Sequence, residues 1–192
     1  AFIMDHDRII PIGGRFAELA NPPGVMCRTT KEAEVTDIFS ILKSDHELHR
    51  EMLAKIAASK GDSAERRDLF EAFRIEVTAH AAAEEQSLYA TMLGDPELQE
   101  DGRHSVAEHK EIDDMLGELQ NADLSEDDWS EQFKALRHRY EHHIDEEEED
   151  MFPAAEKEFN KAKAKELGAI FDKRKPVEME QAEEAENGSE KE

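Results

Sequence analysis

The sequence is poor in cysteine and aromatic residues and has no long apolar run. Its single cysteine, Cys27, excludes an intrachain disulfide among the 192 residues and favours a reducing, cytoplasmic setting. No run of apolar residues approaches the roughly 18 that a membrane-spanning helix requires. We therefore expect a cytoplasmic protein that does not span a membrane.

Basic residues are also scarce. The chain has 24 Lys and Arg against 48 Asp and Glu, which gives a formal net charge of −24. Such a surface repels the phosphate backbone of nucleic acids and the anionic face of a membrane. We therefore expect no nucleic-acid partner and no membrane partner. The oligomeric state is left open.

Breakers and charge divide the chain into three parts. Six glycines and prolines fall in the first 24 residues, which predicts an irregular N-terminal arm over residues 1–34. Residues 175–192 are acidic with almost no aliphatic side chains, and we expect a disordered tail there. Residues 35–174 remain for a folded domain.

Helical periodicity runs through the middle part, and no segment alternates as a strand would. The fold class predicted is all-α: an antiparallel four-helix up-down-up-down bundle with an additional C-terminal helix. The expected helices run from a capping box at Thr29–Glu32 to Gly61, from 62 to Gly94, from Pro96 through an interruption near Gly102 to Asn121, from Ser125 to a break at Phe152-Pro153, and from 154 to 173.

The two halves of the bundle repeat each other at an offset of 63 residues. The stretch "DHELHREML" at 45–53 matches "EHKEIDDML" at 108–116, and "HAAAEEQSLY" at 80–89 matches "HIDEEEEDMF" at 143–152. An internal repeat of this kind implies a pseudo-two-fold axis through the bundle. The repeat pairs three polar positions on apolar helix faces: His46 with His109, His80 with His143, and Glu84 with Glu147.

Two carboxylates inside a core cost several kcal/mol or stay protonated unless something compensates them. No lysine or arginine lies on the same helix faces at that level, so divalent cations are the simplest partners. Imidazole with carboxylate suits iron, manganese or zinc. The spacing predicts two metals about 3.5–4 Å apart. His46 and His80 would hold one ion, His109 and His143 the other, and Glu84 and Glu147 would bridge them.

The pattern H…HxxxE…H…HxxxE, with "DH", "HAAAEE", "EH" and "HHIDEEEEDMFP" around it, resembles the hemerythrin-like cation-binding (HHE) domain over about Val35 to Lys173. The resemblance implies two iron ions with a bridging oxo or hydroxo group. It also implies binding or sensing of O₂ or a related gaseous or peroxide ligand. The alternatives are a di-iron enzyme acting on peroxide or nitric oxide, an iron–sulfur cluster repair protein, and an iron-responsive interaction module.

Two positions depart from the oxygen-carrying members. Those proteins have a fifth histidine four residues after the first on the third helix, where this chain has Asp113. They also place a carboxylate five residues after the last histidine, a spacing that Glu148 would satisfy, whereas the repeat favours Glu147. Either His49 or Asp113 could supply an additional ligand, and the sequence leaves this open.

The remaining polar residues near these motifs have simpler interpretations. The other acidic residues of 145–150 are expected to form a charged, solvated face, and His104, His138 and His142 to lie on the surface. Tyr140 could donate a hydrogen bond to a bound oxygen species, or it could be only the aromatic counterpart of Val77 in the repeat.

Overall fold

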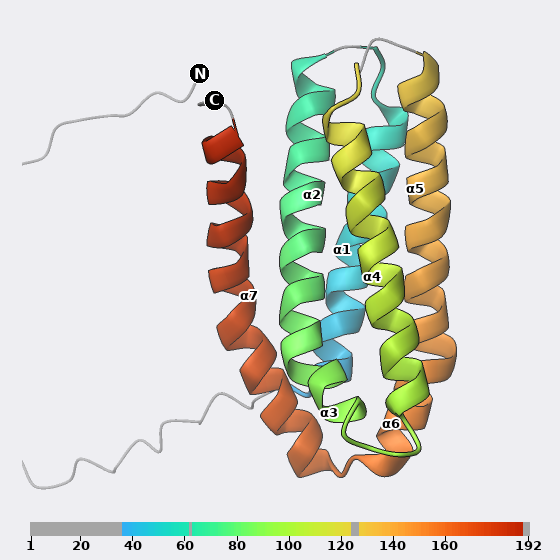
Figure 1. Cartoon of the computed structure of the whole chain (residues 1–192), viewed down its shortest axis with the longest axis vertical. Coiled ribbons are helices and arrows are strands. Elements are labelled where there is room, and N and C mark those ends of the chain that lie inside the picture. Colours follow the sequence, from blue (N-terminus) through green and yellow to red (C-terminus); the bar gives the residue numbers. More distant parts are fainter. Residues whose placement is uncertain (1–35, 62, 124–126, 190–192) are drawn as a thin grey trace, which may run out of the picture. The chain divides into compact units, whose positions relative to one another are not determined.

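Four long antiparallel helices form the body of the protein (Figure 1). The structure, a computed structural model, describes residues 36–61, 63–123 and 127–189, and these residues contain no β-strand. The predicted arm, Cys27 and the Thr29–Glu32 capping box lie outside the described residues. The four helices are α1 (Ile38–Ala58), α2 (Ala64–Glu84), α4 (Gln99–Gln120) and α5 (Asp127–Glu146). The predicted all-α four-helix bundle is confirmed.

Side-chain caps fix where two of the helices begin. The backbone N–H of Ser40 donates to the side chain of Asp37 at 3.1 Å, so α1 begins at Ile38 and not at the predicted capping box. The backbone N–H of Arg66 donates in the same way to Ser63, which starts α2 as predicted.

The third long helix differs from the prediction at two points. It begins at Gln99, because Pro96 lies in the turn before it. It also continues through Gly102, where an interruption was expected. A Cβ at Gly102 would lie 3.3 Å from the Cβ of Met92, so the glycine permits close packing against α3 (Ala90–Met92).

Two π-helical segments continue the second and fourth long helices. Helix α2 passes into η1 (Glu85–Tyr89) and then α3, and α5 passes into η2 (Glu147–Met151) and then α6 (Phe152–Glu158). The predicted break at Phe152-Pro153 is therefore wrong. Pro153 stands in the first turn of α6, directly after the π-helical turn. The helix ends instead at Phe159, whose backbone is extended.

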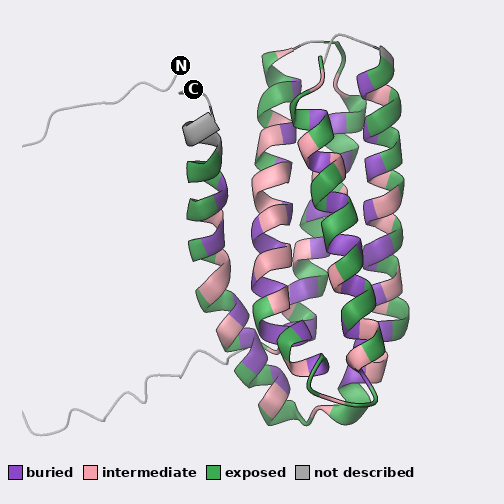
Figure 2. Cartoon of the chain, viewed as in Figure 1, coloured by how far each residue is buried: buried purple, intermediate pink, exposed green. Residues whose placement is uncertain are grey.

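The core consists of two apolar clusters separated by a polar layer at mid-length. One cluster gathers around Phe39, Leu88, Phe152 and Phe171, and the other around Phe73, Leu116, Trp129 and Leu136. Figure 2 shows the buried residues along the inner faces of all four long helices. The polar side chains that the repeat singles out lie between the two clusters.

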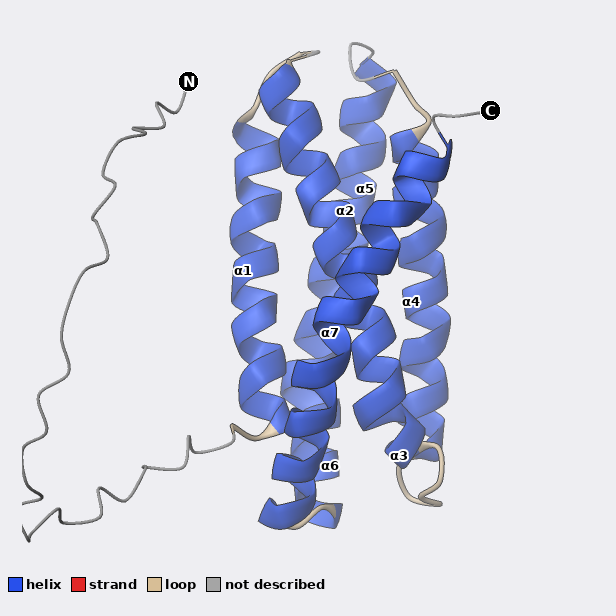
Figure 3. Ribbon diagram, turned by 90° about the vertical axis from the view of Figure 1, so that its left-hand side faces the viewer, coloured by secondary structure: helices blue, strands red, loops and turns tan. Residues whose placement is uncertain are grey.

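A fifth long helix, α7 (Lys161–Ser189), packs against α2 and α1 (Figure 3). The segment expected to be a disordered tail from residue 175 is therefore helical through Ser189. Tertiary contacts explain the difference, since Glu178 and Ala182 are buried. Close packing is possible near the start of α7, where a Cβ on Gly168 would lie only 2.4 Å from the Thr36 carbonyl oxygen.

None of the helices in the described part of the chain is both long enough and apolar enough to cross a membrane.

Candidate metal centre

The polar layer brings together all six residues that the sequence predicts as metal ligands. Each is at least 93% buried and comes from a different turn of α1, α2, α4, α5 or η2. Every histidine Nε2 faces a glutamate oxygen of the same layer. The distances are 3.3 Å from His46 and 3.1 Å from His143 to Glu147, and 3.6 Å from both His80 and His109 to Glu84.

The other ring nitrogen of each histidine is held by a carboxylate outside the layer. The Nδ1 contacts are His46 with Glu148 at 2.9 Å, His80 with Asp45 at 3.0 Å, His109 with Glu85 at 2.9 Å and His143 with Glu108 at 2.8 Å. Each carboxylate accepts a hydrogen bond from the Nδ1–H, which fixes the tautomer and leaves the Nε2 lone pair facing inward. This arrangement is typical of metal-binding histidines.

These four outer carboxylates follow the same internal repeat. Asp45 and Glu108 are 63 residues apart, as are Glu85 and Glu148. The sequence prediction missed them as functional residues, and it assigned Glu148 to a solvated face although its side chain is only 24% exposed. The offset of 63, applied to the neighbours of the predicted ligands, is the signal that identifies them.

The inner atoms of the layer have no hydrogen-bond partner among the described residues. They are the Nε2 atoms of His46, His80 and His109, both carboxyl oxygens of Glu84 and Oε2 of Glu147. Burial, with the adjacent Glu147, raises the pKa of Glu84 well above its usual range. Burial also pushes the pKa of Glu147 upward, but His143 and His46 outweigh it and hold that pKa below its usual range.

Burial lowers the pKa of His80 to about 4, so its imidazole is neutral at pH 7. The layer offers imidazole nitrogens and carboxylate oxygens, the donor set that a divalent transition metal takes. Ligand atoms of His109, His143 and Glu147 already lie within 4.8 Å of one another. The residues fit a metal centre.

Two buried tyrosines adjoin the layer. The Tyr89 hydroxyl donates a hydrogen bond to Oε1 of Glu147. This contact was missed in the sequence, because a π-helical turn after Glu84 places Tyr89 on the inner face five residues later. The Tyr140 hydroxyl is hydrogen-bonded to Nδ1 of His49 at 2.6 Å.

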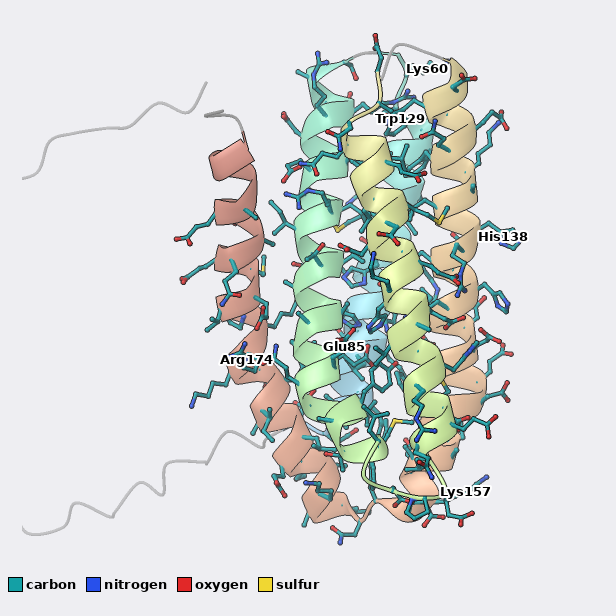
Figure 4. All side chains as sticks on the ribbon, viewed as in Figure 1. Lys60, Glu85, Trp129, His138, Lys157 and Arg174 are labelled. Carbon is teal, nitrogen blue, oxygen red and sulfur yellow. The ribbon has the colours of Figure 1, made fainter. Side chains whose placement is uncertain are left out.

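The two candidate extra ligands lie in different surroundings. His49 is fully buried and its Nε2 has no partner among the described residues, a pattern that it shares with His46, His80 and His109. Asp113 is exposed and does not join the layer. The other three histidines of the described residues, His104, His138 and His142, are exposed as predicted, and Figure 4 shows His138 on the outside of α5.

A cavity of about 290 Å³ connects this layer to the surface between α2 and α4. His109, His143 and Tyr140 line its inner part, and Glu85 and Asp113 lie at its rim; Figure 4 shows Glu85 between the two helices. The walls are mostly small or apolar, among them the run of alanines that precedes Glu84. Small side chains thus leave a path by which a ligand can reach the histidines.

Comparison with known proteins gives consistent matches. The family model described as the hemerythrin HHE cation binding domain matches residues 37–155. Uncharacterized proteins of Mycobacterium tuberculosis (Rv2633c) and Mycobacterium bovis (Mb2666c) are each 30% identical over 118 residues, which cover 60% of this chain and 70% of theirs. The crystal structure of an HHE cation-binding domain-containing protein of Mycobacterium kansasii, an Rv2633c homologue, superposes with a TM-score of 0.68 at 26% identity. That match covers 76% of this chain and 89% of the other.

Proposed function

The chain belongs to the hemerythrin HHE cation-binding domain family, and from this premise we propose that it holds two iron ions in the polar layer and binds or senses O₂ or a related small ligand there. His46 and His80 would hold one ion and His109 and His143 the other. Glu84 and Glu147 would bridge them, together with an oxo or hydroxo group. Manganese and zinc suit the same donors.

The observation that carries this proposal is the set of unpaired inner atoms. Three imidazole nitrogens and three carboxylate oxygens of the proposed ligands are buried in one layer without a partner among the described residues. Buried polar groups are normally paired, because each unmet one costs about 1–3 kcal/mol. Cations bound between them would satisfy all of these atoms at once.

The surrounding residues supply the rest of a ligand-binding site. A pair of iron ions provides redox activity and open coordination positions for an oxygen-containing ligand. The cavity between α2 and α4 admits such a ligand, and its apolar walls limit the access of bulk water. Tyr140 lines the cavity with its ring next to that of His143, and its hydroxyl is hydrogen-bonded to His49.

The test is metal content together with the near-ultraviolet spectrum of protein purified without added metal. The proposal requires about two irons per chain and an oxo-bridged absorption band that changes reversibly with O₂. Purified protein that carries no metal and takes up none when ferrous iron is supplied would contradict it. Two manganese or zinc ions in place of iron would leave the site standing but exclude oxygen binding of this kind.

A second function, turnover of hydrogen peroxide, is favoured by the residue at position 113. Asp113 is exposed and does not supply a ligand in place of a fifth histidine. The half that contains His109 and His143 therefore has only these two histidines near its metal position. Both of these histidines line the cavity. A metal ion with fewer protein ligands is more reactive, which favours turnover of a substrate over reversible binding of O₂. Peroxide consumption whose rate saturates with substrate, without a reversible O₂ spectrum, would select this alternative.

A further inference from the structure

Helix α7 reaches the outer partners of the polar layer although it lies beyond the segment matched by the family, residues 37–155. The Lys175 ammonium lies 2.7 Å from Oδ2 of Asp45 and 2.6 Å from Oε1 of Glu76. The same Oδ2 of Asp45 is 3.0 Å from Nδ1 of His80. A chain of contacts thus runs from α7 through one carboxylate to a predicted ligand.

The second half of the bundle contains an equivalent chain with a different source of charge. Arg139 on α5 donates to Glu108 at 2.7 Å and to Glu111 at 3.0 Å. Glu108 in turn holds Nδ1 of His143 at 2.8 Å. In both halves a cation binds two carboxylates, and one of these carboxylates orients a histidine.

The internal repeat explains why the cation comes from a different helix in each half. The residue 63 positions before Arg139 is Glu76, so the first half carries a negative charge where the second half carries the cation. Without another cation, Asp45 and Glu76 would be two carboxylates close together at the back of His80. Lys175 occupies the place between them.

We propose that Lys175 is a positioning residue of the metal centre: from α7 it supplies the cation that the first repeat lacks at position 76, and it thereby holds Asp45 against Nδ1 of His80. The effect on metal binding rests on the function proposed above. The assignment of α7 as a structural part of the site rests on the contacts themselves.

Burial makes this contact effective. The side chains of Lys175, Asp45 and Glu76 are only 14%, 17% and 12% exposed, so water screens their charges little. Helix α7 also covers the ring of His80 directly, since Phe171 packs edge-on against it at 5.6 Å between centroids. The cation and the aromatic ring therefore fix His80 from the same helix.

The experiment removes the positive charge of Lys175 and then restores a positive charge at position 76. Lys175→Met removes it, Glu76→Arg in the Lys175→Met background restores it at the position that Arg139 occupies in the other half, and Lys175→Arg is the conservative replacement. Lys173→Met, at an exposed position on the same helix, is the matched control. Release of metal from the loaded full-length protein to a chelator is followed for each variant.

Changes in residues that orient metal-bound histidines typically weaken metal affinity about 10–100-fold. We expect Lys175→Met to accelerate release of one of the two ions by about that factor, and Lys173→Met to release both ions as the unchanged protein does. Glu76→Arg should slow release again in the Lys175→Met background. Equal acceleration of both ions, or no rescue by Glu76→Arg, would overturn the proposal.

A second measurement does not depend on metal. In the chelated protein, losing a mostly buried ion pair should lower the Tm of Lys175→Met by about 5–10 °C. Glu76→Arg should recover most of that loss in the Lys175→Met background and should not stabilise the protein that retains Lys175. If the protein binds no metal, the proposed function fails, but these Tm values still test the role of Lys175. A double variant, Lys175→Met with Glu76→Arg, whose Tm stays as low as that of Lys175→Met alone would refute that role.

Discussion

Replacing Glu84 by leucine should change the stability of the protein in opposite directions with and without metal. Both carboxyl oxygens of Glu84 are buried without a partner among the described residues, and the nearest imidazoles, His80 and His109, lie 3.6 Å away. Because burial keeps His80 neutral at pH 7, it does not compensate the carboxylate. Glu84 therefore lowers the free energy of unfolding of the metal-free protein.

The magnitude follows from those two oxygens. At about 1–3 kcal/mol for each of the two unmet buried acceptors, Glu84→Leu should stabilise the chelated protein by about 2–6 kcal/mol. At roughly 2–4 °C per kcal/mol for a chain of this size, the Tm should rise by about 4–24 °C. Metal-loaded protein should instead lose stability, because the variant lacks a bridging ligand.

Thermal unfolding by circular dichroism, with chelator and after iron loading, measures both effects. Glu118→Leu is the matched control, since Glu118 is exposed on α4 and should change neither Tm by much. If Glu84→Leu destabilised the chelated protein by more than about 1 kcal/mol, the reasoning would be refuted, because a loss of that size means that protein groups already satisfy the carboxylate.

Three further predictions concern packing, a buried hydrogen bond and metal linkage. Gly168→Ala should destabilise the protein by about 1–3 kcal/mol, because the new Cβ would clash with the Thr36 carbonyl. Gly117→Ala, where the space around the Cβ is open, should stabilise the protein by up to about 1 kcal/mol. Equal effects of the two substitutions in denaturant titrations would contradict this. Tyr140→Phe should cost about 1–3 kcal/mol in chelated protein by leaving Nδ1 of His49 unpaired, and an unchanged Tm would show that this hydrogen bond contributes nothing. Chelation of the loaded protein should lower its Tm, by about 3–6 °C for each 10-fold excess of metal over its Kd, and a Tm independent of metal would exclude a cation in the layer.

The long helices and their buried faces could be predicted from the sequence, because apolar residues recur at helical spacing and the chain repeats at 63 residues. The same repeat singled out six polar residues that the structure brings together in one layer. The outer carboxylates Asp45, Glu85, Glu108 and Glu148 obey the repeat as well, so they were within reach of the sequence.

Other features depend on tertiary packing and have no local signal. The π-helical turns begin at or just after Glu84 and Glu147, and nothing in "EEQSLY" or "EEEEDM" distinguishes them from α-helix. The role of Tyr89 follows from one of these turns. The length of α7 was also missed, because residues such as Ala182 become buried only when α7 packs on α2.

The central claim is that two metal ions lie between Glu84 and Glu147. Anomalous diffraction at the iron edge, from crystals of iron-loaded protein, locates them directly. We expect two peaks about 3.5–4 Å apart, one beside His46 and His80 and the other beside His109 and His143. Iron-loaded crystals with no anomalous peak between the two glutamates would contradict the account.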